Sequence, residues 1–193
     1  MPSNNMDSKK FLSTYLEDFS DLVMPKEETV EKLAVVADFL KDVHSAGKKT
    51  LIFGNGGSAA MASHFSVDLT KNAGLRCVNF NEADLITCFT NDYGFERWVE
   101  KAVDFYGDEG DLLIVISSSG SSKNMHNGVK AARKGNFKAV VTFSGFEQDN
   151  HLRQLGDINL WVDSKAYNFV ENMHQIWLLA TVDLIIGSRE YSA

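Results

Sequence analysis

The chain has few cysteines and prolines and no long apolar run. Its 193 residues include two cysteines and two prolines. Cys77 and Cys88 lack the spacing of a metal or redox motif, so we expect reduced thiols. The longest apolar runs, at 112–116 and 177–182, are too short to span a membrane. The first ten residues lack the apolar stretch of a signal peptide. These absences predict a cytoplasmic protein without a membrane partner.

The chain also lacks an excess of positively charged residues. The formal net charge is -7 and the sequence pI is about 5.2. Such a chain has no broad basic field for nucleic acid, so we expect no nucleic-acid partner. Apolar residues make up 44% and charged residues 23%, which are ordinary values for a globular protein. This length predicts one domain, with room for an added arm.

Both ends of the chain have a helical pattern. Apolar residues recur every three or four positions from residue 9 to about 45, and Pro25 suits the start of a second helix. The segment 168–187 is a helix pattern that is apolar on most sides, which is typical of wide burial, including burial between subunits. We therefore predict a helical arm over residues 1–46 that contributes to oligomerisation.

Short apolar runs alternate with helical stretches after Gly47. The apolar runs are 50–53, 76–80, 111–117, 138–143 and 158–162. The helical stretches between them are 58–72, 83–91, 96–106, 122–134 and 149–155. This alternation indicates crossover connections and a parallel sheet with helices on both faces. Residues 47–193 are thus predicted to form an α/β domain.

Two polar loops follow strands of this predicted sheet. GNGGS, from Gly54 to Ser58, follows the first strand, and SSSGSS, from Ser117 to Ser122, follows the third. Ligands of open parallel sheets bind at the carboxyl ends of strands, and the helix starts that follow favour anions. Either loop alone could be an ordinary turn, but together they predict a phosphate site. Neither fits a nucleotide-binding pattern, so we expect no nucleotide cofactor.

Ionisable side chains are placed to act beside that phosphate site. His64 and Asp68 lie one helical turn apart behind GNGGS, and Glu171 and His174 share a face of the last helix. A single histidine on a helix is usually a core residue, and a single aspartate is usually an exposed surface charge. Two such pairs facing each other would suit proton transfer or a rearranged metal site.

Three stretches resemble a known family. GNGGSA at 54–59, TNDYG at 90–94 and GDLLIVISSSGSS at 110–122 resemble a sugar isomerase (SIS) domain. Nearly the whole chain is similar to the phosphoheptose isomerases, which convert sedoheptulose 7-phosphate to D-glycero-D-manno-heptose 7-phosphate. The resemblance implies a flavodoxin-like three-layer fold with five parallel strands and a homotetramer. It also implies a role in making heptose precursors for lipopolysaccharide or capsule.

The resemblance also assigns site residues by position. Contacts to the sugar phosphate fall on Asn55, Gly56, Gly57, Ser58, Asp92, Ser117, Ser118, Ser119 and Ser122. In the catalytic set His64 matches, whereas Asp68 stands where glutamate is usual and Glu171 where glutamine is usual. Leu179 replaces a second histidine. Those four family positions can bind zinc, so His64, Asp68 and Glu171 are the metal ligands to test, with zinc as the cofactor.

These departures leave three interpretations. In the first, the chain is an isomerase, with Asp68 or Glu171 as the base and His64 or His174 completing the proton relay. In the second, it is a catalytically silent SIS protein that binds a sugar phosphate or a protein partner, similar to the DnaA-initiator-associating protein. In the third, it isomerises a different sugar phosphate. The first is the one we adopt here.

Two uncharged residues bear on the third interpretation. Asn72 stands where an arginine would help to bind the sugar, and Asn168 stands where the family often has aspartate. The missing charges would favour a different sugar over strict identity of substrate.

Overall fold

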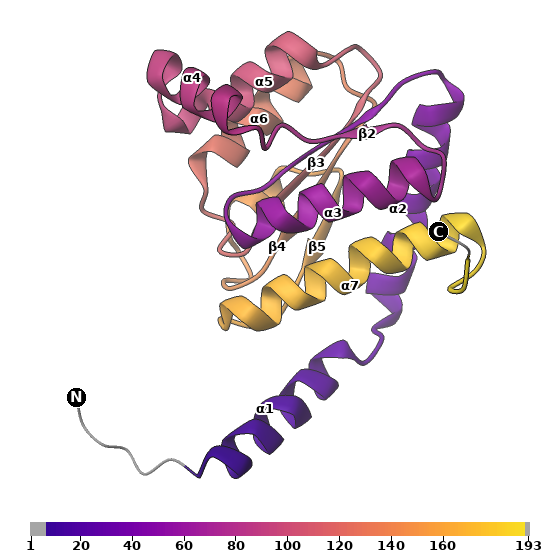
Figure 1. Cartoon of the computed structure of the whole chain (residues 1–193), viewed down its shortest axis with the longest axis vertical. Helices are drawn as coiled ribbons and strands as arrows, with labels where there is room; N and C mark the ends of the chain where they lie inside the picture. Colours follow the sequence, from indigo (N-terminus) through magenta and orange to yellow (C-terminus); the bar gives the residue numbers. More distant parts are fainter. Residues whose placement is uncertain (1–6, 192–193) are drawn as a thin grey trace.

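The computed structural model describes residues 7–191 as a parallel sheet with helices on both faces (Figure 1). The strands are β1 (Thr50–Phe53), β2 (Cys77–Val78), β3 (Leu112–Ser117), β4 (Ala139–Ser144) and β5 (Ile158–Trp161). They pair in the order β2-β1-β3-β4-β5, and every pair is parallel. This is the flavodoxin-like order, so the predicted fold class is confirmed.

The helices form the two outer layers and a projection at the N-terminal end. They are α1 (Ser8–Val23), α2 (Glu27–Ser45), α3 (Gly57–Lys71), α4 (Ala83–Tyr93), α5 (Trp98–Tyr106), α6 (Lys123–Lys134) and α7 (Tyr167–Ile186). Two short 3₁₀ helices, η1 (Phe95–Arg97) and η2 (Leu152–Gln154), complete the set. Among residues 7–191, no helix is both long enough and apolar enough to cross a membrane.

The sheet divides the core into two halves. Alternate side chains of a strand point to opposite faces, so Leu112 and Ile114 of β3 pack with α2, α3 and α7. Leu113 and Val115 of the same strand pack with α5 and α6 on the other face. Both faces are covered, which explains why the strand sequences are continuously apolar rather than alternating.

Three predicted elements are shorter in the structure. Only Cys77 and Val78 of the predicted strand 76–80 pair with β1. The side chains of Asn79 and Asn81 instead bond to serines of α3, with Asn79 Nδ2 2.7 Å from Ser66 Oγ. The predicted helix 149–155 is only the short η2, and the predicted helix 96–106 begins as a 3₁₀ turn before α5.

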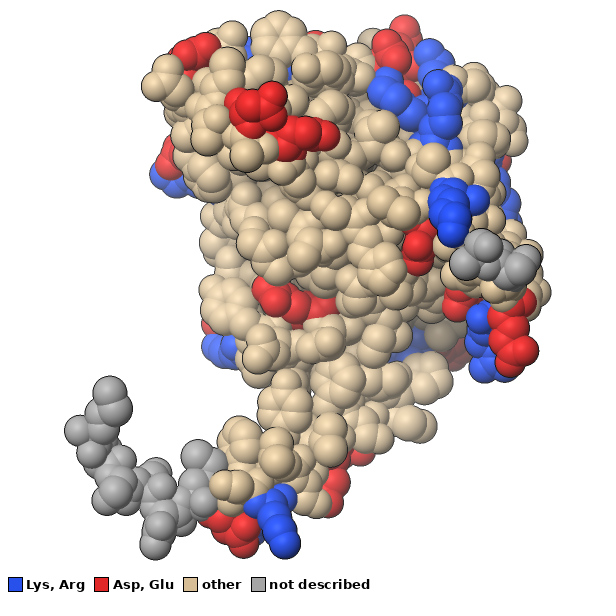
Figure 2. All heavy atoms as spheres, viewed as in Figure 1, with Lys and Arg blue, Asp and Glu red and all other residues tan. Residues whose placement is uncertain are grey.

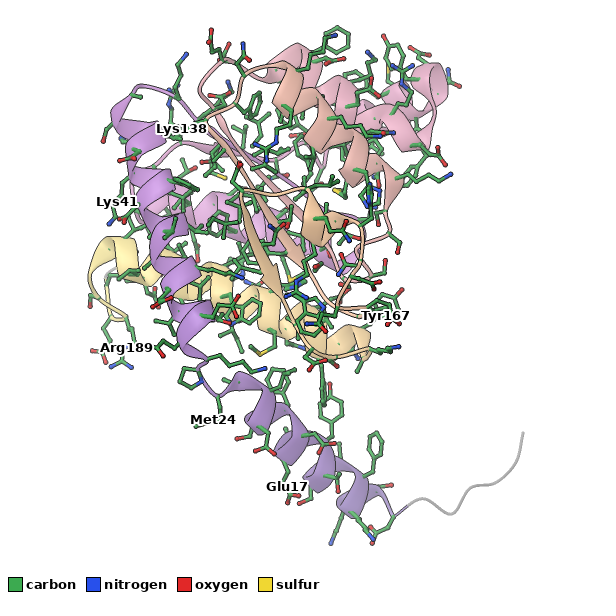
Figure 3. The ribbon with its side chains drawn as sticks, turned by 180° about the vertical axis from the view of Figure 1, so that it is seen from behind. Glu17, Met24, Lys41, Lys138, Tyr167 and Arg189 are labelled. Carbon is green, nitrogen blue, oxygen red and sulfur yellow. The ribbon has the colours of Figure 1, made fainter. Side chains whose placement is uncertain are left out.

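The two N-terminal helices differ in how they pack. Val36, Leu40 and Val43 of α2 lie in the core against the sheet. No residue of α1 is buried, and α1 projects beyond the body, as the positions of Glu17 and Met24 show (Figure 3). The predicted arm over residues 1–46 therefore contains one helix that packs on the sheet and one that extends from it.

Candidate functional site

The first glycine-rich loop turns the chain from β1 into α3. Gly56 has a φ of 55°, a backbone conformation that favours glycine. A Cβ at Gly54 would lie 2.5 Å from the backbone of Ser58, so that position also needs a residue without a side chain. Ser58 is buried in the first turn of α3. The loop thus presents the N-terminal end of a 15-residue helix, which favours anions.

The serine-rich loop follows β3 at the same edge of the sheet. Ser117 Oγ lies 3.0 Å from Ser122 Oγ, and the backbone N–H of Ser121 donates to Ser119 Oγ at 3.2 Å. Ser118 Oγ is buried and has no hydrogen-bond partner within residues 7–191. A buried hydroxyl without a partner is unfavourable, so a ligand oxygen at this loop would gain an unused partner.

An asparagine pair joins the two loops. Asn55 Nδ2 donates to Asn124 Oδ1 at 3.1 Å, and Asn124 Nδ2 donates back to Asn55 Oδ1 at 2.9 Å. Asn124 is buried in the first turn of α6. Asn124 could not be predicted from the sequence, because its partner is 69 positions away and no local pattern marks the pair.

His64 and Asp68 lie together on α3, as their spacing predicts. His64 Nε2 is 3.3 Å from Asp68 Oδ2, and 54% of the His64 side chain is exposed against 21% for Asp68. Asn72, one turn further on, donates to Asp68 Oδ1 at 3.3 Å. Gln175 Nε2 lies 3.1 Å from His64 Nδ1 and comes from α7, which runs beside α3 (Figure 1). The sequence analysis did not single out Gln175.

Glu171 connects α7 to the first loop. A Cβ on Gly57 would lie 2.7 Å from Glu171 Cδ, so the carboxyl group packs directly against the first residue of α3. A carboxylate is favoured at this end of a helix because the backbone N–H groups carry partial positive charge. Glu171 is therefore placed at the N-terminal end of the helix that carries His64.

His174 lies on the side of α7 that faces the core. Its side chain is fully buried, and Nε2 donates to the Ser144 carbonyl oxygen at 3.0 Å. Nδ1 has no partner within residues 7–191, and burial lowers the pKa of His174 to about 4. The ring is thus a neutral core group bonded to β4, and the structure does not place it with the His64 pair.

Asp92 also lies apart from the His64 pair. It occupies the exposed C-terminal end of α4, where its Oδ1 accepts a hydrogen bond from Asn91 Nδ2 at 2.9 Å. The α4 helix packs on α5 and η1, on the other side of the sheet from α3. A role for Asp92 in this site remains a prediction.

The predicted zinc ligands do not converge. Across residues 7–191, no three His, Cys, Asp or Glu side chains form a group that could hold a metal ion. His64 and Asp68 pair with each other, whereas the Glu171 carboxyl group packs on Gly57. A zinc site draws its protein ligands to one point, so this arrangement does not fit a zinc ion.

Comparison with known proteins finds both a family model and individual relatives that match this chain. The family model of the SIS domain matches residues 14–144. The chain is 33% identical over 175 residues to a phosphoheptose isomerase of Fusobacterium nucleatum, covering 86% of this chain and 89% of the relative.

Solved structures agree with that match. A phosphoheptose isomerase from Neisseria gonorrhoeae superposes with a TM-score of 0.85 at 27% identity, covering 92% of this chain and 98% of that one. One from Francisella tularensis has a TM-score of 0.83 at 28% identity, covering 93% and 98%.

Proposed function

The chain belongs to the SIS domain family, and on that premise we propose that it is a phosphoheptose isomerase. The reaction would interconvert sedoheptulose 7-phosphate and D-glycero-D-manno-heptose 7-phosphate. One observation carries the proposal: Asn55 and Asn124 join two anion-favouring loops, and the helix that begins at the first loop carries the His64 and Asp68 pair. The similarity to named phosphoheptose isomerases supports it.

The loops would bind the phosphate with neutral donors. Hydroxyl and backbone N–H groups at two helix starts surround an anion without a fixed positive charge. The binding groups we propose are those of Asn55, Gly56, Gly57, Ser58, Ser117, Ser118, Ser119 and Ser122. The Ser118 hydroxyl, which has no partner within residues 7–191, would supply a further donor to this group.

The spacing along α3 suits a sugar of this length. His64 follows Ser58 by six positions, which corresponds to roughly 9 Å along the helix axis at 1.5 Å per residue. An extended seven-carbon chain has a comparable length. A phosphate held at the loops would therefore bring the carbonyl end of the sugar close to His64 and Asp68.

The isomerisation moves one carbon-bound proton to the neighbouring carbon. A base takes a proton from C1 of the ketose, the hydroxyl proton passes from O1 to O2, and the base returns its proton to C2 of the enediol. Both ring nitrogens of His64 are already engaged, so a carboxylate is the base that this arrangement supports. We assign that role to Asp68, with Glu171 as the second carboxylate facing the sugar.

The test is turnover of sedoheptulose 7-phosphate, followed by NMR of the aldose product. Asp68→Asn keeps the size of the side chain but removes its basicity, so kcat should fall by roughly 100-fold or more. Glu171→Gln tests the second carboxylate, and Asp38→Asn, an exposed position on α2, is the matched control. The assay is run on chelator-treated protein with and without added zinc. Wild-type protein that neither binds nor converts any ketose phosphate would overturn the proposal.

A catalytically silent sugar-phosphate binder is the second candidate function. The observations that favour it are the engaged nitrogens of His64 and the shorter carboxylate at Asp68, together with Leu179 on the same helix as Glu171. Saturable binding of sedoheptulose 7-phosphate without any aldose product would support this function. Turnover abolished by Asp68→Asn would exclude it.

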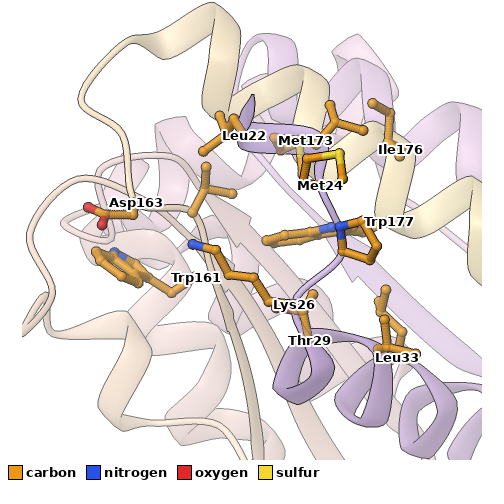
Figure 4. A pocket seen from close by; sticks show the side chains of 14 residues that line it. Leu22, Met24, Lys26, Thr29, Leu33, Trp161, Asp163, Met173, Ile176 and Trp177 are labelled. Atoms are coloured by element: carbon orange, nitrogen blue, oxygen red, sulfur yellow. The ribbon is translucent and has the colours of Figure 1, made fainter. Parts of the chain in front are cut away.

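We also propose that the chain assembles with copies of itself, as a homotetramer. Phe11, Leu12 and Leu16 of α1 are more than half exposed, although they form the apolar stripe of the helix. An apolar pocket lies where α1 meets the body, between Met24, Trp161 and Trp177 (Figure 4). The central part of the face over α3 and α7 carries few charged side chains (Figure 2). Exposed apolar side chains such as those of α1 are typical of protein interfaces.

A further inference from the structure

Gln175 is the one polar side chain of α7 that bonds to the His64 ring. It reaches His64 across the contact between α7 and α3, from a position 111 residues away in the chain. We propose that Gln175 is a positioning residue, which fixes the orientation and the tautomer of the His64 ring, with Nδ1 as the acceptor and Nε2 as the donor. The catalytic consequence rests on the isomerase function proposed above, whereas the hydrogen bond itself does not.

The donor and acceptor inventory leads to this tautomer. The amide nitrogen of glutamine only donates, so with Gln175 Nε2 at 3.1 Å the Nδ1 atom of His64 must accept. An ionised carboxylate only accepts, so the Nε2 atom of His64 must carry the proton that faces Asp68 Oδ2 at 3.3 Å. A neutral imidazole with one donor and one acceptor satisfies both partners. The other neutral tautomer would satisfy neither.

The arrangement continues to the far side of the carboxylate. Asn72 donates to Asp68 Oδ1, so Gln175, His64, Asp68 and Asn72 form one chain of hydrogen bonds across two helices. Glu171, the charged residue one turn before Gln175 on α7, packs on Gly57 and not on this chain of hydrogen bonds. Gln175 is the link of this chain that comes from outside α3. It therefore sets the position of the ring relative to the helix, and through the ring it orients the Asp68 carboxylate.

The first test uses NMR on the uniformly labelled wild-type protein. We expect a through-hydrogen-bond correlation between the Gln175 side-chain amide and His64 Nδ1, with nitrogen shifts that report an unprotonated Nδ1 and a protonated Nε2. A protonated Nδ1 in the neutral ring would overturn the proposal. This readout needs no substrate, so it is independent of the proposed function.

The second test compares substitutions at position 175. Gln175→Met keeps the length but removes the donor, and loss of one such bond should lower kcat by about three- to ten-fold. KM should change less than two-fold, because the phosphate loops are untouched. Gln175→Glu replaces the donor by an acceptor of the same length, which should remove the hydrogen bond that His64 Nδ1 accepts and change the orientation of the ring. Asn172→Met, at an exposed position of α7 that bonds only to the Asn168 carbonyl, is the matched control.

The outcomes separate the two proposals. Loss of kcat at constant KM in both Gln175 variants, with Asn172→Met unchanged, would support the positioning role. Unchanged kinetics in an active protein, together with an unchanged ring in Gln175→Glu, would overturn it. An inactive wild-type protein that shows the expected NMR correlation would overturn the isomerase function and leave the positioning of the ring supported. If Gln175→Met fails to fold, the kinetics of Gln175→Glu and the NMR spectrum of the wild type test the positioning role.

Discussion

His174 shows how strongly burial controls a single side chain. Its ring lies in the apolar core, packs edge-on to Phe143 and bonds to the Ser144 carbonyl oxygen. Burial lowers its pKa to about 4, well below the usual value of about 6.5 for histidine. The folded protein therefore keeps the ring neutral over a pH range in which the unfolded chain binds a proton.

This difference predicts a loss of stability in acid. The contribution of neutral His174 is fully present above pH 6.5 and is lost progressively as the pH falls towards 4. At pH 4.5 it should lower the free energy of unfolding by about 2 to 3 kcal/mol relative to pH 7.5. Urea unfolding at the two pH values measures it. His174→Gln, which keeps a donor for Ser144 but cannot titrate, should lose that part of the pH dependence.

The control for this prediction is His44→Gln, at an exposed position of α2. The effect is assigned to His174 only if His174→Gln loses more of the pH dependence than His44→Gln does. A His174→Gln variant that loses as much stability between pH 7.5 and 4.5 as the wild type would contradict the assignment to His174.

Residue-scale predictions from the sequence succeeded where a local pattern carried them. His64 and Asp68 are four apart on one helix, so their contact follows from helical spacing alone. Gln175 and Asn124 bond to partners 111 and 69 positions away, and their neighbours in the sequence give no sign of it. His174 shared a predicted helix face with Glu171, but the tertiary packing turns its ring into the core.

At the scale of elements, the serine-rich loop is held by contacts that the sequence does not reveal. Gly120 has a φ of 66°, and its carbonyl oxygen accepts a bond from the His126 ring at 2.8 Å. A Cβ at Gly120 would overlap the side chain of Asn150, which donates to Ser144 Oγ at 3.2 Å and to the Gly145 carbonyl oxygen at 3.1 Å. The loop therefore depends on the end of β4 for its shape.

Gly120→Ala should consequently disturb both folding and phosphate binding. The positive φ alone should cost roughly 1 to 2 kcal/mol in a residue with a Cβ. Displacement of Asn150 should add to that and weaken the affinity for sedoheptulose 7-phosphate. Gly74→Ala is a matched control, because Gly74 has a φ of 72° but no atom near its Cβ position. Isothermal titration and urea unfolding measure the two effects, and equal losses in both variants would argue against a specific role for the Asn150 contact.

Element boundaries were less predictable than element types. The run 50–53 coincides with β1, a strand of four residues, because it lies between Lys49 and the glycine-rich loop that begins at Gly54. The predicted strand 76–80 is reduced to the edge strand β2, since Asn79 and Asn81 bond to α3 instead of to a neighbouring strand. Such competition between side-chain and backbone bonds has no periodic signature in the sequence.

At the scale of the whole molecule, the layers followed from the alternation of apolar runs and helices, whereas the strand order followed from the resemblance to the SIS domain. The position of α1 could not be predicted in this way. Its amphipathic pattern indicates only that one face of the helix is buried, and not which surface buries it. In the structure that face meets the body through Tyr15 and Phe19, which contact Phe169 at ring distances of 4.6 and 5.4 Å. The remainder of the stripe is exposed.

The proposed tetramer makes a prediction about this stripe. Leu16 is 65% exposed in the single chain, so Leu16→Glu should leave the fold of one subunit intact while it places a charge in the interface. Light scattering should give the mass of a tetramer for the wild type and a smaller mass for Leu16→Glu. Thr14→Glu, at an exposed position two residues before Leu16 and so on the opposite side of α1, is the control and should keep the wild-type mass. A wild-type protein with the mass of one chain would contradict the proposal.

The Asn55 and Asn124 pair also bears on the chemical lifetime of the protein. Asn55 precedes Gly56, and an asparagine before glycine is the type of site that converts most readily to aspartate by deamidation. In the folded state the Asn55 amide is held on both its nitrogen and its oxygen by Asn124. The pair that joins the loops thus also restrains the side chain that would have to move for deamidation to begin. If it did begin, the new carboxylate would place a negative charge in the proposed phosphate site, so an aged molecule would bind a sugar phosphate less tightly.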